Sequence, residues 1–395
     1  MAQAVDICVI GGGIQGAGVA QSAALSGLSV VLVEKTGWAA GTSSKSSKLI
    51  HGGLRYLETL QLGLVRESLR ERRTLLKIAE DIVKPNWFYL PIYKNSRHRV
   101  WQVRLGLLLY WLLAGWNNHG AFKTLPQAKW EELEGLNTAD LKHVFMYQDA
   151  QTNDAELTRR VIASAEEHGA TLLCPATFLS AEKCPEGYLV SIAINRQITT
   201  FKCRRLVNAG GPWANQIADS SAPKPPIPSV DLVKGTHLQF TEQLSPRCFY
   251  LEAQPDQRPV FVLPYQGGTL LGTTETIFTG DPDQVNPDSN EVDYLLETLH
   301  YQFPHFQYKP VNAWAGLRVL PAGHTDASRR SREVQFVESD DYLAIYGGKL
   351  TVYRATAHKA VEVLLRSLQL ADAATRPNMK SDTAFEIADT AQVKL

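Results

Sequence analysis

The sequence has no excess of charge of either sign, because 40 lysines and arginines are balanced by 40 aspartates and glutamates. Proteins that bind nucleic acid over an extended surface usually carry a basic face and a high isoelectric point. The balance therefore argues against a nucleic-acid partner. Any site for an anion must be a local cluster of cations.

Cysteine patterns that mark disulfide frameworks or metal sites are also absent from the sequence. The five cysteines are an odd number, and no CxxC pair or metal-ligand spacing occurs among them. Cys8 and Cys203 lie in apolar runs typical of strands, where a free thiol behaves as a small hydrophobic group. The chain reaches a glycine-rich loop soon after Asp6, which is not the pattern of a secretory signal. We expect no metal site, reduced thiols and a cytoplasmic location.

No apolar run in the sequence approaches the roughly 20 residues that span a bilayer. The nearest approach is LGLLLYWLLA at 105–114, which is flanked by arginines and tryptophans. Two interpretations of residues 97–116 remain open. In one, they form a helix buried between domains. In the other, the helix lies at a membrane surface, with basic and tryptophan side chains at headgroup level and leucines in the acyl boundary.

The remaining pattern is that of a globular enzyme, with an apolar fraction of 44% over 395 residues. A strand over 5–10, a helix ending near Gly27 and a strand over 29–34 form a βαβ unit at the N-terminus. Helices are also predicted over 62–79, over 154–168 with Asp154 as N-cap signal, and over 288–301. Strands are predicted over 170–174, 188–194, 201–208, 230–240, 259–264 and 270–274, and again within 310–348 before a final helix.

Gly11, Gly13 and Gly16 form a G-x-G-x-x-G pattern between the first strand and the first helix. The first glycine permits a tight turn, the second lets backbone approach a pyrophosphate, and the third lets helix and strand pack closely. Glu34 closes the second strand, where a carboxylate accepts hydrogen bonds from ribose hydroxyls and disfavours a 2′-phosphate. These features predict a dinucleotide site.

The segment TSSKSSKLIHGGLRYLE at 42–58 decides between NAD and FAD. An NAD enzyme usually continues through further βα units, whereas this chain breaks into a hydroxyl-rich segment and returns to glycine-rich turns near 210 and 347. Such remote contacts suit an extended FAD. The segment also contains a diglycine, a histidine, an arginine and a tyrosine. This mixture suits a segment that lies between a bound dinucleotide and a small anionic substrate and contacts both.

Seven motifs occur in this order along the chain: GGGIQGAG at 11–18, TSSKSSKLIHGGLRYLE at 42–58, VNAGGPW at 207–213, KGTH at 234–237, GTTE at 272–275, GLRVLP at 316–321 and GGKLTVYR at 347–354. With them, the chain resembles the FAD-dependent glycerol-3-phosphate dehydrogenases of the D-amino-acid-oxidase-like superfamily. The resemblance covers residues 5 to about 360. It implies oxidation of sn-glycerol 3-phosphate to dihydroxyacetone phosphate, with hydride passing from C2 to flavin N5 and electrons then passing to a quinone.

The resemblance further implies non-covalently bound FAD and a cytoplasmic enzyme held peripherally on the inner face of the cell membrane through residues 97–116. A homodimer is compatible with it. The residues expected to bind FAD are Gly11, Gly13, Ile14, Gly16, Glu34, Lys35, Thr42, Ser43, Ser47, His51, Gly52, Gly53, Ala209, Gly210, Trp213, Gly348, Leu350 and Thr351.

A phosphomonoester needs several cations, and arginine can bind it through two parallel N–H bonds. The positions that converge in the family give Arg55, Arg332 and Lys349 as phosphate ligands, with Tyr56 as a further donor. His237 is the expected base, because an imidazole titrates near neutral pH. Arg318 is expected to hold and polarise the substrate oxygen.

The implied fold is a two-domain α/β flavoprotein, in which a Rossmann-like FAD-binding domain is interleaved with an antiparallel-sheet substrate domain. We predict that residues 1–80, 145–222 and 310–370 form the FAD-binding domain. Residues 81–144 and 223–309 are expected to form the substrate domain, and 371–395 a C-terminal tail. The proline-rich stretch 222–228 is predicted to connect the two domains. Lys45 stands where the family usually has a small residue and Glu275 where it usually has aspartate. Compared with the family, we expect the sequence to be a short form that lacks the usual C-terminal helical domain.

Two other functions remain open at this stage. The cations would fit a carboxylate as well as a phosphate, so the chain is alternatively an oxidase or dehydrogenase of another small anionic hydroxy compound, such as a 2-hydroxy acid. In the other alternative it is a non-catalytic FAD-binding paralogue that acts as a partner or sensor. The sequence leaves the electron acceptor open between quinone and oxygen.

Overall fold

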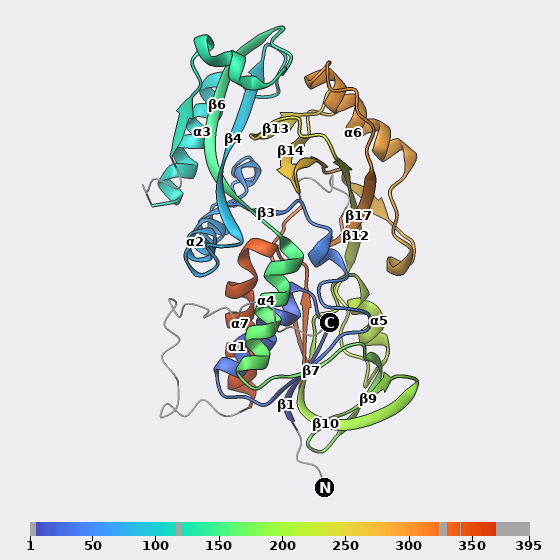
Figure 1. Ribbon diagram of the computed structural model, residues 1–395. Coiled ribbons are helices and arrows are strands. Elements are labelled where there is room, and N and C mark those ends of the chain that lie inside the picture. Colours follow the sequence, from blue (N-terminus) through green and yellow to red (C-terminus); the bar gives the residue numbers. More distant parts are fainter. Residues whose placement is uncertain (1–4, 116–120, 324–329, 340, 369–395) are drawn as a thin grey trace.

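The structure is a computed structural model that describes residues 5–115, 121–323, 330–339 and 341–368. These residues form two β-sheets stacked end to end along the long axis of the molecule, with helices on their outer sides (Figure 1). The α-helices are α1 (Ile14–Leu25), α2 (Leu62–Ile78), α3 (Val100–Leu113), α4 (Asp154–Glu167), α5 (Ala214–Asp219), α6 (Ser289–Gln302) and α7 (Tyr353–Ser367).

The first sheet follows the order β11-β8-β9-β10-β1-β2-β7, with β19 beside β10 and β18 beside β19. Its centre, β7-β2-β1-β10-β19, is parallel, as expected for a dinucleotide-binding fold. The strands are β1 (Val5–Ile10), β2 (Val30–Val33), β7 (Thr171–Leu173), β8 (Thr177–Cys184), β9 (Gly187–Ile194), β10 (Gln197–Asn208), β11 (Ser221–Ala222), β18 (Gln335–Ser339) and β19 (Tyr342–Tyr346).

Helix α1 packs between α4 and α7 on one face of this sheet (Figure 1). Its contact face consists of small residues such as Ala17, Ala20 and Ala23, all fully buried. Small side chains let the helix approach the sheet closely, so the α1 N-terminus stays at the carboxyl ends of the parallel strands. That position is the usual ligand site of such a fold.

The second sheet follows the order β16-β12-β15-β14-β13-β4-β6-β3, with β17 beside β12 and β5 beside β6. Apart from the β13–β4 pair it is antiparallel. The strands are β3 (Leu49–Ile50), β4 (Val83–Tyr93), β5 (Phe122–Thr124), β6 (Leu141–Thr152), β12 (Val230–Phe240), β13 (Cys248–Glu252), β14 (Pro259–Tyr265), β15 (Gly268–Gly272), β16 (Thr276–Phe278) and β17 (Asn312–Pro321).

Two strands differ from the predicted division of the chain. The prediction puts residues 145–152 and 310–321 with the first domain, whereas β6 and β17 are hydrogen-bonded members of the second sheet. Strand β17 pairs with β12 along its whole length, from Val230↔Pro321 to Gln239↔Asn312. This pairing joins segments far apart in the sequence, so the local pattern around 310 does not show it. The proline-rich stretch 222–228 does lie between strands of different sheets.

The N-terminus of α4 also differs from the prediction. Asn153 is the N-cap and accepts from the Glu156 N–H at 3.1 Å. Asp154 instead pairs with buried Lys48 at 2.7 Å and accepts from the backbone and hydroxyl of Ser46. The carboxylate thereby fixes the 42–48 segment against α4.

Helix α3 is not buried between the two sheets. One side, with Leu107 and Tyr110, packs against the second sheet, and the helix lies on the outside of β4 and β6 (Figure 1). The opposite side exposes a stripe of apolar residues at helical spacing: Trp101, Leu105, Leu108 and Leu112. Among the described residues, no helix has the length and apolarity to cross a bilayer.

Candidate active site

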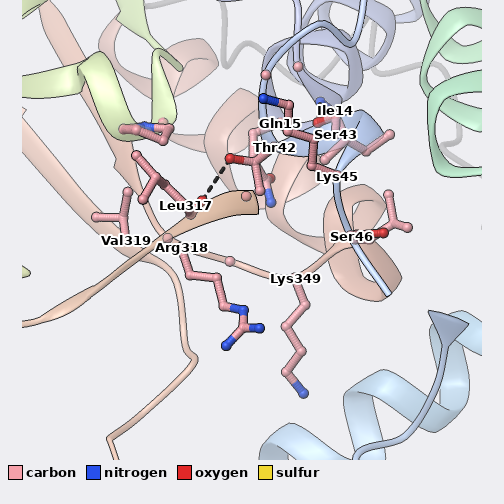
Figure 2. A pocket seen from close by; sticks show the side chains of 18 of the residues that line it. Ile14, Gln15, Thr42, Ser43, Lys45, Ser46, Leu317, Arg318, Val319 and Lys349 are labelled. Atoms are coloured by element: carbon pink, nitrogen blue, oxygen red, sulfur yellow. Dashed lines mark hydrogen bonds between the residues drawn. The ribbon is translucent and has the colours of Figure 1, made fainter. Parts of the chain in front are cut away.

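A cavity of about 710 Å³ lies where the two sheets meet. Its lining comes from the α1 N-terminus, the 42–56 segment, the turn after β10, and strands β12 and β17 of the second sheet. Figure 2 shows Arg318 and Lys349 extending side by side into this space. The cavity is therefore shared between the parallel and the antiparallel sheet.

The glycine loop after β1 has the shape that a dinucleotide requires. Gly11 has φ +114°, and a Cβ there would lie 2.5 Å from the carbonyl oxygen of Ala209. A Cβ on Gly16 would lie 1.9 Å from the Gly11 oxygen, so this glycine permits the close packing of helix and strand. The Gly12 N–H donates to Glu34 at 2.8 Å. The Glu34 carboxylate retains capacity for a further donor such as a ribose hydroxyl.

The 42–58 segment links the two sheets beside this loop. The Ser43 hydroxyl accepts from the Ile14 N–H at 2.9 Å, and the Thr42 hydroxyl donates to the Leu317 carbonyl of β17 at 2.7 Å (Figure 2). Residues Leu49 and Ile50 then pair with β6 as strand β3. The segment thus runs from the cofactor loop into the second sheet.

The diglycine of this segment rests on a buried polar cluster. The Gly52 N–H donates to the Tyr110 hydroxyl at 2.8 Å, and that hydroxyl donates to Asp149 at 2.8 Å. Asp149 also pairs with buried Arg72. A Cβ on Gly52 would lie 2.4 Å from the Tyr110 oxygen, so only glycine fits there. The cluster sets the backbone beside His51, whose ring lines the cavity.

In the KGTH motif of β12 and the GTTE motif that begins at the end of β15, successive side chains point to opposite faces of the sheet and have different roles. Lys234 and Thr236, together with Thr274, hold the buried carboxylate of Glu291 at 2.8 to 3.0 Å, which fixes α6 to the sheet. The intervening residues line the cavity: Gly235, His237, Thr273 and Glu275. Half of each motif is therefore structural, as the two-residue period of a strand dictates.

His237 is buried, and its Nε2 lies 3.0 Å from the Ser47 hydroxyl. Its Nδ1 has no hydrogen-bond partner among the described residues. Burial lowers the His237 pKa to about 3, with further lowering by the charges of Arg318 and Lys48. The imidazole is therefore neutral at physiological pH, and its pKa lies below the near-neutral value expected from the sequence.

Glu275 is surrounded by four arginines. Its Oε1 contacts Arg332 and, at 3.2 Å, Arg318, while its Oε2 lies 2.6 Å from Arg258 and 3.7 Å from Arg55. Burial raises the pKa of Glu275, but the arginines, Arg332 foremost, outweigh it and lower the pKa to about 2. The carboxylate stays ionised within a cluster of net positive charge.

Lys349 extends from the turn before η8 (Leu350–Val352) toward the same cluster. Its Nζ lies 4.0 Å from the centroid of the Tyr56 ring and donates to Ser68 at 3.1 Å. Burial lowers the Lys349 pKa to about 7, and the charge of Arg332 adds to the lowering. A bound anion would offset both effects.

The structure brings nearly all the predicted site residues to one cavity. His237, Arg318, Arg55, Tyr56, Arg332 and Lys349 line it, as do the predicted FAD-binding residues other than two. Those two are Gly16, which packs inside the helix–strand contact, and Gly52, which faces Tyr110. The prediction missed Arg258 and the role of Glu275. Arg258 belongs to no motif, so only its pairing with Glu275 identifies it.

The family of FAD-dependent oxidoreductases matches residues 6–359. The chain belongs to this family. It is 36% identical to a D-erythritol 1-phosphate dehydrogenase from Brucella abortus (91% of this chain, 73% of the relative). It is 35% identical to a glycerol-3-phosphate dehydrogenase from Pseudomonas aeruginosa (92% and 72%). It also resembles the solved FAD complex of a glycerol-3-phosphate dehydrogenase from Bacillus halodurans, with TM-score 0.75, 27% identity and coverage of 93% and 65%.

Within the family the chain is thus a relative of the glycerol-3-phosphate dehydrogenases, and it spans about two thirds of the length of the proteins it matches. The cofactor is FAD. The cavity fits that group, because the glycine loop leaves no room for a Cβ and the Gln15 side-chain oxygen in its lining has no partner among the described residues. The glycine loop and Glu34 would hold the adenosine and pyrophosphate end.

Proposed function

We propose that this protein oxidises sn-glycerol 3-phosphate to dihydroxyacetone phosphate with FAD bound non-covalently. One observation carries the proposal: four clustered arginines, Lys349 and a neutral histidine face one cavity beside the FAD-binding loop. A phosphomonoester carries up to two negative charges and three acceptor oxygens, which suits clustered arginines better than a neutral alcohol does.

The residues divide the reaction between two ends of the substrate. Lys349, Tyr56 and Arg55 bind the phosphate, and Arg318 donates to the oxygen on C2. His237 accepts the hydroxyl proton, so the C2–O bond becomes a carbonyl as the hydrogen on C2 leaves with its electron pair. Bound FAD supplies the acceptor for that hydride. Ser47 orients the imidazole through its hydrogen bond.

A four-carbon polyol phosphate is the second candidate substrate, because the relative from Brucella abortus is named for D-erythritol 1-phosphate. It presents the same phosphate and secondary alcohol to the same residues. Anaerobic mixing of the FAD-loaded protein with glycerol 3-phosphate, D-erythritol 1-phosphate, lactate and glycerol, followed by flavin absorbance, separates the cases. Fastest bleaching by glycerol 3-phosphate supports the first candidate. Bleaching by lactate alone, or by none of the four, contradicts a polyol-phosphate dehydrogenase.

Substrate affinity should fall as pH rises through about 7. Lys349 is charged below its pKa of about 7 and neutral above it, so the free protein loses one phosphate ligand in that interval. We expect the KM for glycerol 3-phosphate to rise by about tenfold between pH 6.5 and 8.5, in line with loss of one charge-assisted hydrogen bond. The measurement is KM against pH.

The matched variant is Lys349→Arg, whose guanidinium stays charged throughout this range. It should remove the rise in KM near pH 7. A rise of equal size in Lys349→Arg would assign the pH dependence to another group.

We also propose that the protein works at the inner face of the cell membrane, where a quinone takes the electrons. The exposed stripe on α3 supports this, because it places a tryptophan and three leucines on the outside of the second sheet with Arg97, Arg99 and Arg104 nearby. Reoxidation of the reduced protein by a soluble quinone analogue under argon, compared with reoxidation by air, tests the acceptor. Faster reoxidation by air would favour an oxidase.

Liposome flotation tests the membrane surface. We expect the protein to float with anionic vesicles and the double variant Leu105→Glu/Leu108→Glu to remain in the soluble fraction, because two charges would have to enter the acyl boundary. Ile198→Glu is the control, since Ile198 is an apolar residue on β10 that is more exposed than Leu105 and Leu108 and lies far from α3 along the molecule. Equal flotation of all three proteins would remove α3 from the contact.

A further inference from the structure

The arginine cluster is assembled around a carboxylate that belongs to the protein itself. The arginines come from four separate places: Arg55 from η2 (Leu54–Leu57), Arg318 from β17, Arg258 from the residue before β14, and Arg332 from the segment before β18. All four contact Glu275, whose side chain is 1% exposed. A single anion therefore sets the spacing of all four guanidinium groups.

Both oxygens of Glu275 are engaged on different sides. Arg318 and Arg332 approach Oε1, and Arg258 and Arg55 approach Oε2. Arg258 also donates to the backbone carbonyl of Glu275 at 3.3 Å, which ties the guanidinium to the strand connection. The carboxylate consequently occupies the place among the arginines that an incoming anion would otherwise take.

We propose that Glu275 is a positioning residue that fills the centre of the arginine cluster, so that the substrate phosphate binds at the edge formed by Lys349 and Tyr56. This inference rests on the proposed function. It explains how the same site selects one orientation of its substrate. With the centre filled, the phosphate end lies toward Lys349 and the alcohol carbon is left facing Arg318 and His237. Without Glu275, four like charges would face an open space that attracts any small anion.

Charge and ionisation support this role. The four arginines and Glu275 together carry a net charge of +3, which leaves an excess for a phosphomonoester dianion after the carboxylate is satisfied. The low pKa of Glu275 keeps the carboxylate ionised at neutral pH. The centre of the cluster is then occupied by a negative charge.

The role predicts that two properties change in opposite directions. In Glu275→Ala, inorganic phosphate should bind the FAD-loaded protein about tenfold more tightly or better, because it occupies the vacated centre. In the same variant, kcat/KM for glycerol 3-phosphate should fall about tenfold or more, because the substrate binds in the wrong place. Phosphate binding is measured by the change in flavin absorbance, which needs no turnover. A purely structural role would weaken phosphate binding and turnover together.

Formate gives a second readout. It should restore part of the turnover of Glu275→Ala by replacing the missing carboxylate, and it should only inhibit the wild type. Glu275→Gln keeps the volume and should not be restored. Glu291→Gln is the control, because Glu291 is a buried carboxylate of the same domain outside the cavity; it should lower the melting temperature and leave phosphate affinity unchanged.

Weaker phosphate binding in both Glu275 variants, or wild-type turnover in Glu275→Gln, would overturn the inference. The positioning role of Glu275 and the proposed substrate can be tested independently. If glycerol 3-phosphate fails to bleach the wild type while phosphate binds more tightly to Glu275→Ala, the positioning role stands and the substrate assignment falls.

Discussion

Replacement of His237 by asparagine is expected to lower kcat for glycerol 3-phosphate by about 10² to 10⁴-fold while FAD remains bound. The imidazole is the proposed proton acceptor; its Nε2 lies 3.0 Å from the Ser47 hydroxyl, and its ring stacks on Trp314 with ring centroids 5.9 Å apart. Asparagine has no group that takes a proton at neutral pH. The rate of flavin bleaching under anaerobic single-turnover conditions measures the effect.

The control for this prediction is His143→Asn. His143 lies on β6, bonds to Thr124 and does not line the cavity, so its removal should leave the bleaching rate unchanged. The His237 pKa of about 3 also predicts that the wild type shows no loss of kcat centred near pH 6.5, the ordinary histidine range. A bleaching rate within a factor of two of wild type in His237→Asn would assign the proton transfer to another group.

Arg318→Met is expected to lower kcat about 10² to 10³-fold, the usual effect of removing a donor from a developing oxyanion. The Arg318 guanidinium lies over Gly235, where a Cβ would come within 2.5 Å of it, and it contacts Glu275 and Thr273. Burial, followed by repulsion from Arg332, lowers the Arg318 pKa to about 10, so the side chain remains a cation at neutral pH. In the proposed reaction this cation stabilises negative charge on the substrate oxygen.

Arg330→Met provides the comparison. Arg330 pairs with Asp231 at the end of the same strand pair, donates to the Pro321 carbonyl and lies outside the cavity lining, so the variant tests the loss of arginine contacts away from the site. It should change the melting temperature more than the bleaching rate. Arg318→Lys should recover part of the lost kcat, because it keeps the charge without the two-pronged geometry. Equal kcat in Arg318→Met and wild type would exclude Arg318 from the reaction.

The N-terminal unit could be predicted from sequence because its determinants are local. Three glycines, an apolar strand on each side and Glu34 lie within about thirty residues, and their spacing fixes the turn. The second sheet was harder to predict. Strands β12 and β17 are about eighty residues apart, and β6 joins the sheet although α4, which directly follows it, packs on the first. Alternation shows that such a segment is a strand, and it does not show its neighbours.

Contacts between distant residues were equally hard to predict in the candidate active site. The motifs predicted the cavity-lining residues, but no pattern around Arg258 indicates that it joins the other arginines. Glu275 was visible only as a departure from the usual aspartate, since its role depends on four side chains that converge after folding. The apolar segment 105–114 allowed two interpretations because composition does not reveal which face of a helix is buried. Packing of Leu107 and Tyr110 on one side and exposure of Trp101 and Leu105 on the other contradict a helix buried between domains, and contact with a membrane stays a prediction.

The most direct test of the proposed reaction is the rate of flavin reduction by glycerol 3-phosphate deuterated at C2. We expect reduction by glycerol 3-phosphate in a single turnover, slowed several-fold by the deuterium because the C2–H bond breaks in that step, with dihydroxyacetone phosphate formed in an amount equal to the FAD reduced. Absence of reduction, or reduction that yields no dihydroxyacetone phosphate, would contradict it.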